Sequence, residues 1–216
     1  AALMALSETL PAEYNGTFAE VSAKAKRSGG FVMTGHTTKA IAAQGTKTDV
    51  AVTLERTVAK IAVQASTTAE FSERYSGKVR INSAVLSKAA SRGNLIAQQT
   101  RNTGPMTFTH TQAADELSGK FRNLFYVPEN GELAEGSRLL LTLGATYDRD
   151  GNFSTTDDQA EVAYPVELSG DGAGRFLRNG YYRVQALIDG LTGSELSVSI
   201  SVADWETPVT QSVNLG

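Results

Sequence analysis

The sequence lacks cysteine altogether, has only two histidines among its 216 residues, and carries no surplus of charge of one sign. The absence of cysteine excludes disulfide bonds, thiolate metal ligands, iron–sulfur clusters and cysteine nucleophiles. His36 and His110 are too few for a multi-histidine metal site. The formal net charge of −3 gives no basic excess that would indicate a nucleic-acid partner. We therefore expect no metal, no cofactor and no nucleic-acid partner.

Long hydrophobic runs are also missing, because no stretch approaches the roughly 18 consecutive apolar residues of a membrane-spanning helix. Hydrophobic residues nevertheless make up 41% of the chain, which is too high a fraction for a disordered protein. The length fits one ordinary all-β domain or two domains of about 100 residues each. A chain rich in serine, threonine and glycine favours many short strands over long helices.

Alternation of apolar and polar residues is the main pattern of the sequence. Two alternating runs, Leu139–Tyr147 and Ala160–Leu168, flank a polar, turn-rich segment. This arrangement predicts an antiparallel hairpin with a long tip. Two further strands are expected over Tyr182–Ile188 and Leu196–Val202.

The first half of the chain alternates less regularly. Val50, Val52 and Leu54 stand at even-numbered positions, whereas Ile61 and Val63, in the same long run, stand at odd-numbered positions. A switch of this kind predicts a β-bulge, in which an extra residue turns the side chains to the other face.

Helical spacing is scarce and falls near the midpoint. It involves four apolar residues: Ala114, Leu117, Phe121 and Leu124. We take this short predicted helix as a domain junction. The sequence thus predicts an all-β fold with little helix, in two antiparallel β-sandwich domains over residues 1–116 and 117–216 that meet near residues 111–124.

The hairpin tip carries oxygen ligands that suit a calcium ion. Asp148, Asp150 and Asn152 are followed by Asp157 and Asp158. The spacing departs from the EF-hand loop, and these residue types are also the usual turn formers. We favour a solvated turn over a cation site.

A hydrolytic site remains one possible interpretation, because serine, histidine and aspartate, the residues of a catalytic triad, are all present. It would require His36 or His110 within hydrogen-bond reach of a serine and a carboxylate. No Gly-x-Ser-x-Gly nucleophile elbow occurs in the sequence. We therefore expect no enzyme activity.

Four segments, taken in chain order, resemble the fimbrillins, the type V pilins of Bacteroidales. They are Arg56–Val63, Phe125–Asn130, Leu177–Val184 and Val202–Trp205. The similarity extends from about residue 31 to the end of the chain. The positions that carry it are Arg56, Pro128, Asn179, Tyr182 and Trp205. Trp205 is the only tryptophan, and its bulk at the end of a strand also indicates core packing.

The resemblance implies two transthyretin-like β-sandwich domains and a structural role in a fimbria on the bacterial surface, supporting adhesion and virulence. It implies export as a lipoprotein held at the outer membrane before assembly, and trimming by an arginine-specific protease. The implied partners are other fimbrial subunits and host or bacterial surface ligands. A start at Ala1 is what the trimmed form would look like. The short chain points to a minor accessory or tip subunit rather than a stalk subunit.

The final segment is the candidate for strand exchange. Val209, Gln211, Val213 and Leu215 alternate after Pro208. This segment is either the last strand of the second domain or a strand donated to a neighbouring subunit, as in donor-strand complementation. The alternative function is a surface carbohydrate- or protein-binding β-sandwich without strand exchange, for which a cluster of exposed aromatic residues would be the sign.

Overall fold

The computed structural model describes residues 3–9, 16–22, 30–192, 195–205 and 209–215. Within these ranges, helix is limited to a 3-10 turn, η1 (Leu3–Ala5), and two short α-helices, α1 (Phe18–Ser22) and α2 (Ala69–Arg74). The hydroxyl of Thr68 caps α2 by accepting the N–H of Phe71 at 3.2 Å. Neither helix could reach across a bilayer. The predicted all-β fold with little helix is confirmed.

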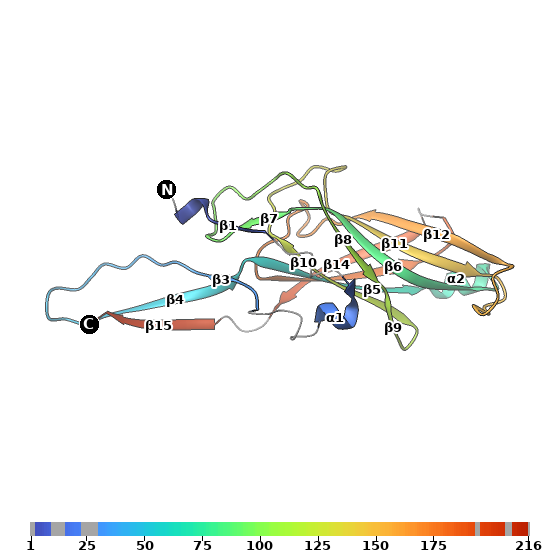
Figure 1. Ribbon diagram of the computed structural model, residues 1–216, viewed down its shortest axis with the longest axis horizontal. Helices are drawn as coiled ribbons and strands as arrows, with labels where there is room; N and C mark the ends of the chain where they lie inside the picture. The colour runs from blue at the N-terminus through green and yellow to red at the C-terminus, as the bar shows by residue number, and fades with distance from the viewer. Residues whose placement is uncertain (1–2, 10–15, 23–29, 193–194, 206–208, 216) are drawn as a thin grey trace.

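Two five-stranded sheets build a sandwich (Figure 1). The first sheet has the order β14 (Leu196–Asp204), β13 (Gly180–Ile188), β5 (Val58–Thr67), β10 (Lys120–Pro128), β9 (Asp115–Leu117). The second has the order β12 (Gln159–Glu167), β11 (Leu140–Asp148), β6 (Lys78–Ala89), β8 (Phe108–Ala113), β2 (Gly16–Thr17). Within these sheets, β5 pairs with β13 and β2 pairs with β8 in parallel, and the other neighbours are antiparallel.

The remaining strands lie outside the two sheets. β1 (Ser7–Thr9) pairs with β7 (Arg92–Asn94). A three-stranded sheet of β15 (Val209–Leu215), β4 (Thr48–Arg56) and β3 (Met33–Thr34) extends away from the sandwich along the long axis of the molecule (Figure 1). We call this sheet the arm.

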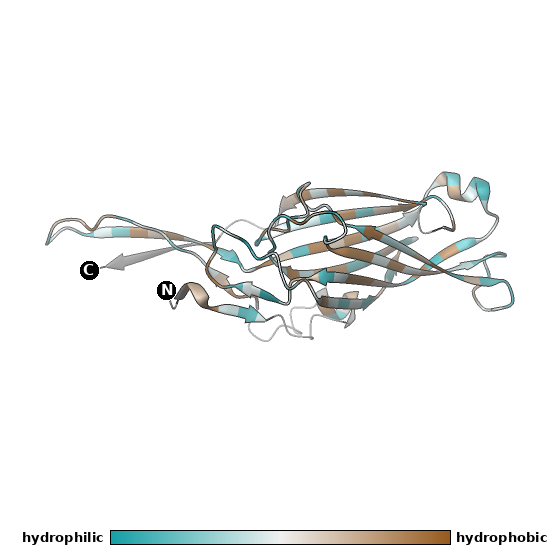
Figure 2. Ribbon diagram, turned by 90° about the horizontal axis from the view of Figure 1, so that it is seen from above, coloured by the Kyte–Doolittle hydropathy of each residue, from teal (hydrophilic) through white to brown (hydrophobic). Residues whose placement is uncertain are grey.

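One continuous core fills the sandwich. It contains Ile61 from β5 and Val184 from β13 in one sheet, and Leu86 from β6 and Leu143 from β11 in the other, each at most 1% exposed. Strongly hydrophobic segments accordingly gather in the strands of the sandwich (Figure 2). The strands that share this core come from both halves of the chain, so the described residues form one sandwich. They do not divide into two successive domains at residues 116 and 117, which lie inside β9.

The segment predicted as a midpoint helix is a hairpin instead. Ser118 and Gly119 have φ of 52° and 72°, which a two-residue type I′ turn requires, and they join β9 to β10. Phe121 then packs against the main core, while Leu124 lies in a smaller cluster on the opposite face of the sheet. The helical spacing was therefore produced by residues that face different sides of a sheet.

The predicted bulge is also absent from β4 and β5, whose strand pairings show no shift of register. Val50, Val52 and Leu54 are half-buried in the arm, whereas Ile61 and Val63 are buried in the core. The apolar residues change from even-numbered to odd-numbered positions where the chain passes from the arm into the sandwich, because the other face of the strand becomes buried there.

The predicted hairpin is confirmed, because β11 and β12 pair from Leu140↔Glu167 to Asp148↔Gln159. The two later strands are confirmed as β13 and β14, which pair with each other.

Candidate functional site

The C-terminal segment lies in the arm. β15 pairs antiparallel with β4, in a register that places Val209 opposite Leu54, and Leu215 opposite Thr48. The same register places Gln211 and Val213 opposite residues 52 and 50. The segment thus forms a strand, as its alternation predicts, and it pairs outside the sandwich. Its donation to a neighbour stays a prediction.

The arm has no hydrophobic core of its own among the described residues. Val50, Val52 and Leu54 of β4 are half-buried, and no side chain of β4 belongs to either buried apolar cluster. Three strands without a covering layer are a marginal structure in water. The arm is therefore a part of the molecule that another chain could rearrange.

Several of the family motif positions meet at the base of the arm. The guanidinium of Arg56 donates to Oδ1 of Asn179 at 3.0 Å and lies 4.7 Å from the ring centroid of Trp205. The backbone N–H of Asn179 donates to the carbonyl of Val58 at 2.9 Å. Asn179 has φ of 58°, a left-handed conformation that asparagine tolerates better than most residues. These contacts attach the end of β4 to the turn before β13.

Trp205 is 7% exposed, which confirms the expected core packing. Its ring stacks on Tyr126 at 5.6 Å and meets Phe31 edge-on at 5.5 Å. Together with Val21 and Leu124 it forms a small cluster on the outer face of the first sheet. We call this the outer cluster.

The other two motif positions also support this end of the sandwich. Tyr182 is 1% exposed, and its hydroxyl accepts the N–H of Leu177 at 2.8 Å. Burial raises the pKa of Tyr182. Pro128 is the last residue of β10 and lies opposite Val58. The family positions are thus structural supports of the junction between sandwich and arm.

A buried ion pair at the same junction escaped the sequence analysis. The side chains of Arg178 and Glu129 are both 5% exposed, and the arginine Nη2 lies 2.5 Å from the glutamate Oε1. The arginine Nε–H donates to the same oxygen at 2.9 Å, and Nη2 and Nη1 also donate to the carbonyls of Asn94 and Leu95 at 2.7 and 3.0 Å. The two charges stand 49 residues apart in the chain. Both lie inside segments that resemble the fimbrillins, which is the only sequence signal for them.

The two sheets leave a groove of mixed polarity between their edge strands β12 and β14. A cavity of about 490 Å³ lies there. Its apolar lining is Val166 of β12 with Val198, Ile200 and Val202 of β14, and its polar lining comes from the end of β12 and the loop after it: Glu167, Ser169, Gly170, Asp171 and Gly172. Val202 is 58% exposed although it shares a face with residues that point into the core. An edge strand also presents backbone N–H and C=O groups that a further strand can pair with. We call this the edge groove.

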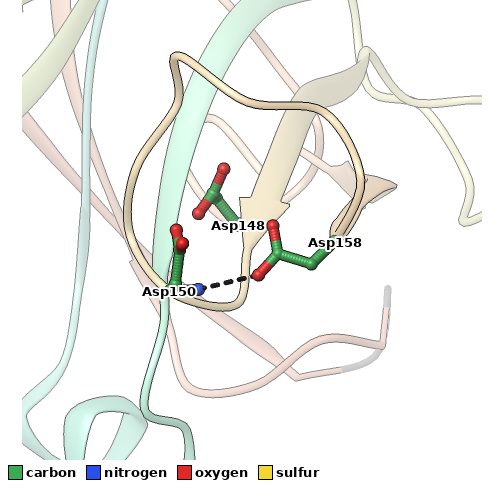
Figure 3. A group of neighbouring side chains, drawn as sticks. All are labelled: Asp148, Asp150 and Asp158. Carbon is green, nitrogen blue, oxygen red and sulfur yellow. Dashed lines mark hydrogen bonds between the residues drawn. The ribbon is translucent and has the colours of Figure 1, made fainter.

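The acidic hairpin tip brings three carboxylates together (Figure 3). One oxygen each of Asp148, Asp150 and Asp158 lies within 4.8 Å of the others. Burial raises the pKa of Asp148, but hydrogen bonds from Gln159, Asp150 and backbone N–H groups outweigh it, so this pKa is lowered. The N–H of Asn152 donates to Oδ1 of Asp148 at 2.8 Å. Such internal bonds fit the turn that the sequence favoured, while the three oxygens remain a group that could hold a cation.

Neither histidine joins a catalytic arrangement. His36 is exposed, and His110 is 1% exposed between the rings of Phe108 and Phe125. Burial lowers the pKa of His110 to about 4, and both ring nitrogens lack a hydrogen-bond partner in the described structure. No hydrogen bond connects either histidine to a serine or a carboxylate among the described residues. The hydrolase interpretation therefore has no geometric support.

No protein-family model matches the sequence, and neither does any curated protein. Among solved structures, the chain is similar to a fimbrilin (FimA) from Porphyromonas gingivalis, with a TM-score of 0.55, 15% identity, and coverage of 94% of this chain and 74% of that one. A candidate cell adhesion protein from Parabacteroides distasonis gives a TM-score of 0.50 and 14% identity, over 70% of this chain and 53% of that one.

A second candidate adhesion protein from Parabacteroides distasonis gives a TM-score of 0.47 and 16% identity, over 72% of this chain and 60% of that one. The chain thus spans little more than half the length of these two proteins. The similar structures are fimbrial or candidate adhesion proteins rather than enzymes. The likeness to the fimbrilin shows that this chain has the fimbrillin fold, as the sequence resemblance implied.

Proposed function

We propose that this chain is a structural or accessory subunit of a bacterial cell-surface fimbria and assembles with other subunits by strand exchange. The observation that carries the proposal is a complementary pair of features. β15 pairs only with the arm among the described strands, while the edge groove between β12 and β14 leaves apolar side chains and two strand edges open. The fimbrillin fold supports the proposal.

The exchange has a simple physical rationale. A strand of seven residues spans about 23 Å, so it would cover most of the nine-residue β14, which spans about 30 Å. Such a strand would add ladder hydrogen bonds to β14 or β12, and its alternate side chains would enter the edge groove. In return β15 would give up its pairing with β4, which has no covering layer. Val209, Gln211, Val213 and Leu215 are the positions that alternate along the proposed donor.

Export, trimming and adhesion belong to the same proposal. The subunit would be held at the outer membrane before assembly, be trimmed by an arginine-specific protease, and contact surface ligands once assembled outside the cell. An accessory or tip position is part of the same proposal. A comparison of the precursor before and after arginine-specific proteolysis tests this step. Larger assemblies are expected only after cleavage; assembly without cleavage would remove trimming from the proposal.

Strand exchange is tested by separating donor from acceptor. Deletion of residues 206–216 removes the donor, and Val202→Asp places a charge in the edge groove. Each protein alone should stay monomeric by light scattering. A mixture of the two should form a 1:1 complex, because one supplies the intact groove and the other the intact strand.

Ser197→Asp is the matched control, because Ser197 is an exposed residue of the same strand β14 whose alternation places it away from the groove. This protein should assemble like the parent. Unchanged assembly after the deletion would show that the C-terminal strand is not the donor. A monomeric parent that still binds surface ligands would favour the simple binding module.

A further inference from the structure

The outer face of the first sheet is covered over only part of its area. α1 lies beside β10 (Figure 1), and the outer cluster around Trp205 covers a further part of the face. Next to α1 the face is open and forms a cavity of about 400 Å³. Its exposed floor consists of polar side chains from three strands: Gln64, Arg183, Gln185, Ser199 and Ser201. We call this the polar groove.

The strand register places these side chains in rows. Gln64 of β5 is opposite Gln185 of β13, which is opposite Ser199 of β14. Arg183 occupies the neighbouring row and is opposite Ser201. On the other side of Gln64, Arg122 of β10 completes the first row. Four adjacent strands span about 14 Å, a length that accommodates a short oligosaccharide.

The floor of the polar groove offers uncommitted hydrogen-bonding groups. Gln64, Gln185, Ser199 and Ser201 make no side-chain hydrogen bond within the part of the chain that the structure describes. Each amide presents donors and an acceptor, and each hydroxyl can do both. This mixture matches the neighbouring hydroxyl groups of a sugar better than it matches an apolar peptide.

The charge of the groove has one sign. Arg122 and Arg183 line it, and no aspartate or glutamate is among its described lining residues. Arg122 is already held by Asp115, whose Oδ2 accepts its Nε–H at 2.9 Å, and it lies 4.5 Å from the ring of Phe18. Arg183 has no carboxylate partner among the described residues, and its guanidinium lies 5.1 Å from the ring of Tyr181.

Arg183 is therefore the cation of the groove that an anionic ligand could pair with. A guanidinium binds a carboxylate through two parallel, charge-assisted hydrogen bonds. The rings of Phe18 and Tyr181 also line the groove, and each lies beside a cation: Arg122 at Phe18, and Lys60, at 4.4 Å, with Arg183 at Tyr181. We propose that the polar groove binds an acidic saccharide, with its carboxylate on Arg183 and its hydroxyls on Gln64, Gln185 and Ser199. This inference deepens the adhesion part of the proposed function and does not require strand exchange.

The test measures binding of the full chain to a hyaluronan tetrasaccharide, with cellotetraose as the neutral probe and tetraglutamate as the acidic peptide probe. Isothermal titration calorimetry should show binding of the acidic saccharide in preference to both others. Arg183→Gln should weaken this binding about tenfold or more, because it removes the charge-assisted pair. Gln185→Ala should weaken it about threefold to tenfold, because a neutral hydrogen bond contributes less.

Arg80→Gln is the matched control, because Arg80 is an exposed arginine on β6 outside the groove. It should leave binding unchanged. The inference would be overturned if cellotetraose or tetraglutamate bound as well as the acidic saccharide, or if the acidic saccharide did not bind. It would also be overturned if the Arg183→Gln protein bound the acidic saccharide as tightly as the parent. The Arg183→Gln protein should still assemble in the mixing experiment above, so failure of saccharide binding and failure of strand exchange give different results.

Discussion

The sandwich and the arm are built from strands with the same alternation, yet they bury their side chains to very different degrees. In β11 the inward residues Leu141 and Leu143 are fully buried beneath the opposite sheet. In β4 the corresponding row, Val50, Val52 and Leu54, is only half-buried. The difference lies in the second layer, which β11 has and β4 lacks among the described residues.

This comparison shows that strand formation and strand stability are separate properties. Alternation is enough to form a ladder, but most of the free energy of folding comes from apolar area removed from water. The sandwich is therefore the stable unit, and the arm is the part that we propose for exchange. The junction between them is where the polar contacts and the family positions concentrate.

The junction should give the largest effect. Glu129→Ala leaves the buried guanidinium of Arg178 without its carboxylate, so we expect the free energy of unfolding to fall by about 3–5 kcal/mol. Urea denaturation measures it. The double variant Glu129→Leu with Arg178→Met should recover part of the loss, because the buried Arg178 charge is removed together with its partner, whereas Arg101, which lies 3.5 Å from Glu129, still loses its carboxylate. A single variant as stable as the parent would mean that the pair does not secure the junction.

A matched pair of truncations compares the two regions directly. Leu143→Ala in the sandwich should cost about 2–5 kcal/mol, because the site is fully buried and leaves a cavity. Val52→Ala in the arm should cost less than about 1 kcal/mol, because the side chain is only half-buried. Denaturation midpoints of the two proteins provide the measurement. Equal losses would contradict the distinction between core and arm.

The sandwich should also respond to acid through His110. Burial lowers its pKa to about 4 from an ordinary 6.5, so the folded state holds the ring neutral where the unfolded state binds a proton. The free energy of unfolding therefore keeps this contribution above pH 6.5. It should fall by about 3 kcal/mol as the pH is lowered from 6.5 to 4.

Thermal unfolding of the parent and of the His110→Leu protein, measured across this pH range, separates the effect of His110 on stability from that of the carboxylates. The leucine protein should lose less stability between pH 6.5 and 4. His36→Gln, at an exposed site, should behave like the parent. If the leucine protein showed the same pH dependence as the parent, the buried histidine would not be its source.

The smallest global effect is expected inside the arm. A Cβ on Gly35 would lie 2.0 Å from the carbonyl oxygen of Thr53, so Gly35→Ala should push β3 away from β4. Amide hydrogen exchange should accelerate in the arm, while the global free energy of unfolding changes by less than about 1 kcal/mol. Ala51→Ser, at an exposed site of β4, is the control. A large global loss would mean that the arm folds as one unit with the sandwich.

Local pattern was sufficient to predict much of the secondary structure. The hairpin of β11 and β12, the strands β13 and β14, and the burial of Trp205 follow from alternation and residue type. The midpoint helix and the bulge were wrong, because each was inferred from side chains whose buried face was unknown. Phe121 and Leu124 have helical spacing but face different clusters across one sheet.

The candidate sites were predicted less completely. The alternating C-terminal segment and the motif positions were visible in the sequence, but the edge groove, the polar groove and the Arg178–Glu129 pair were not. Each of these depends on strands that are distant in the chain. Gln64 and Gln185, for example, become neighbours only through the parallel pairing of β5 with β13.

The sequence by itself determined that the chain is built of short strands without disulfides, because apolar alternation and residue composition act within a few neighbouring residues. Only the tertiary structure decided that both halves of the chain share one sandwich, that β4 leaves it, and that the edge of β14 stays open. Those features depend on which sheet covers which face. That choice is made by the total apolar area buried between distant strands, which no local pattern records.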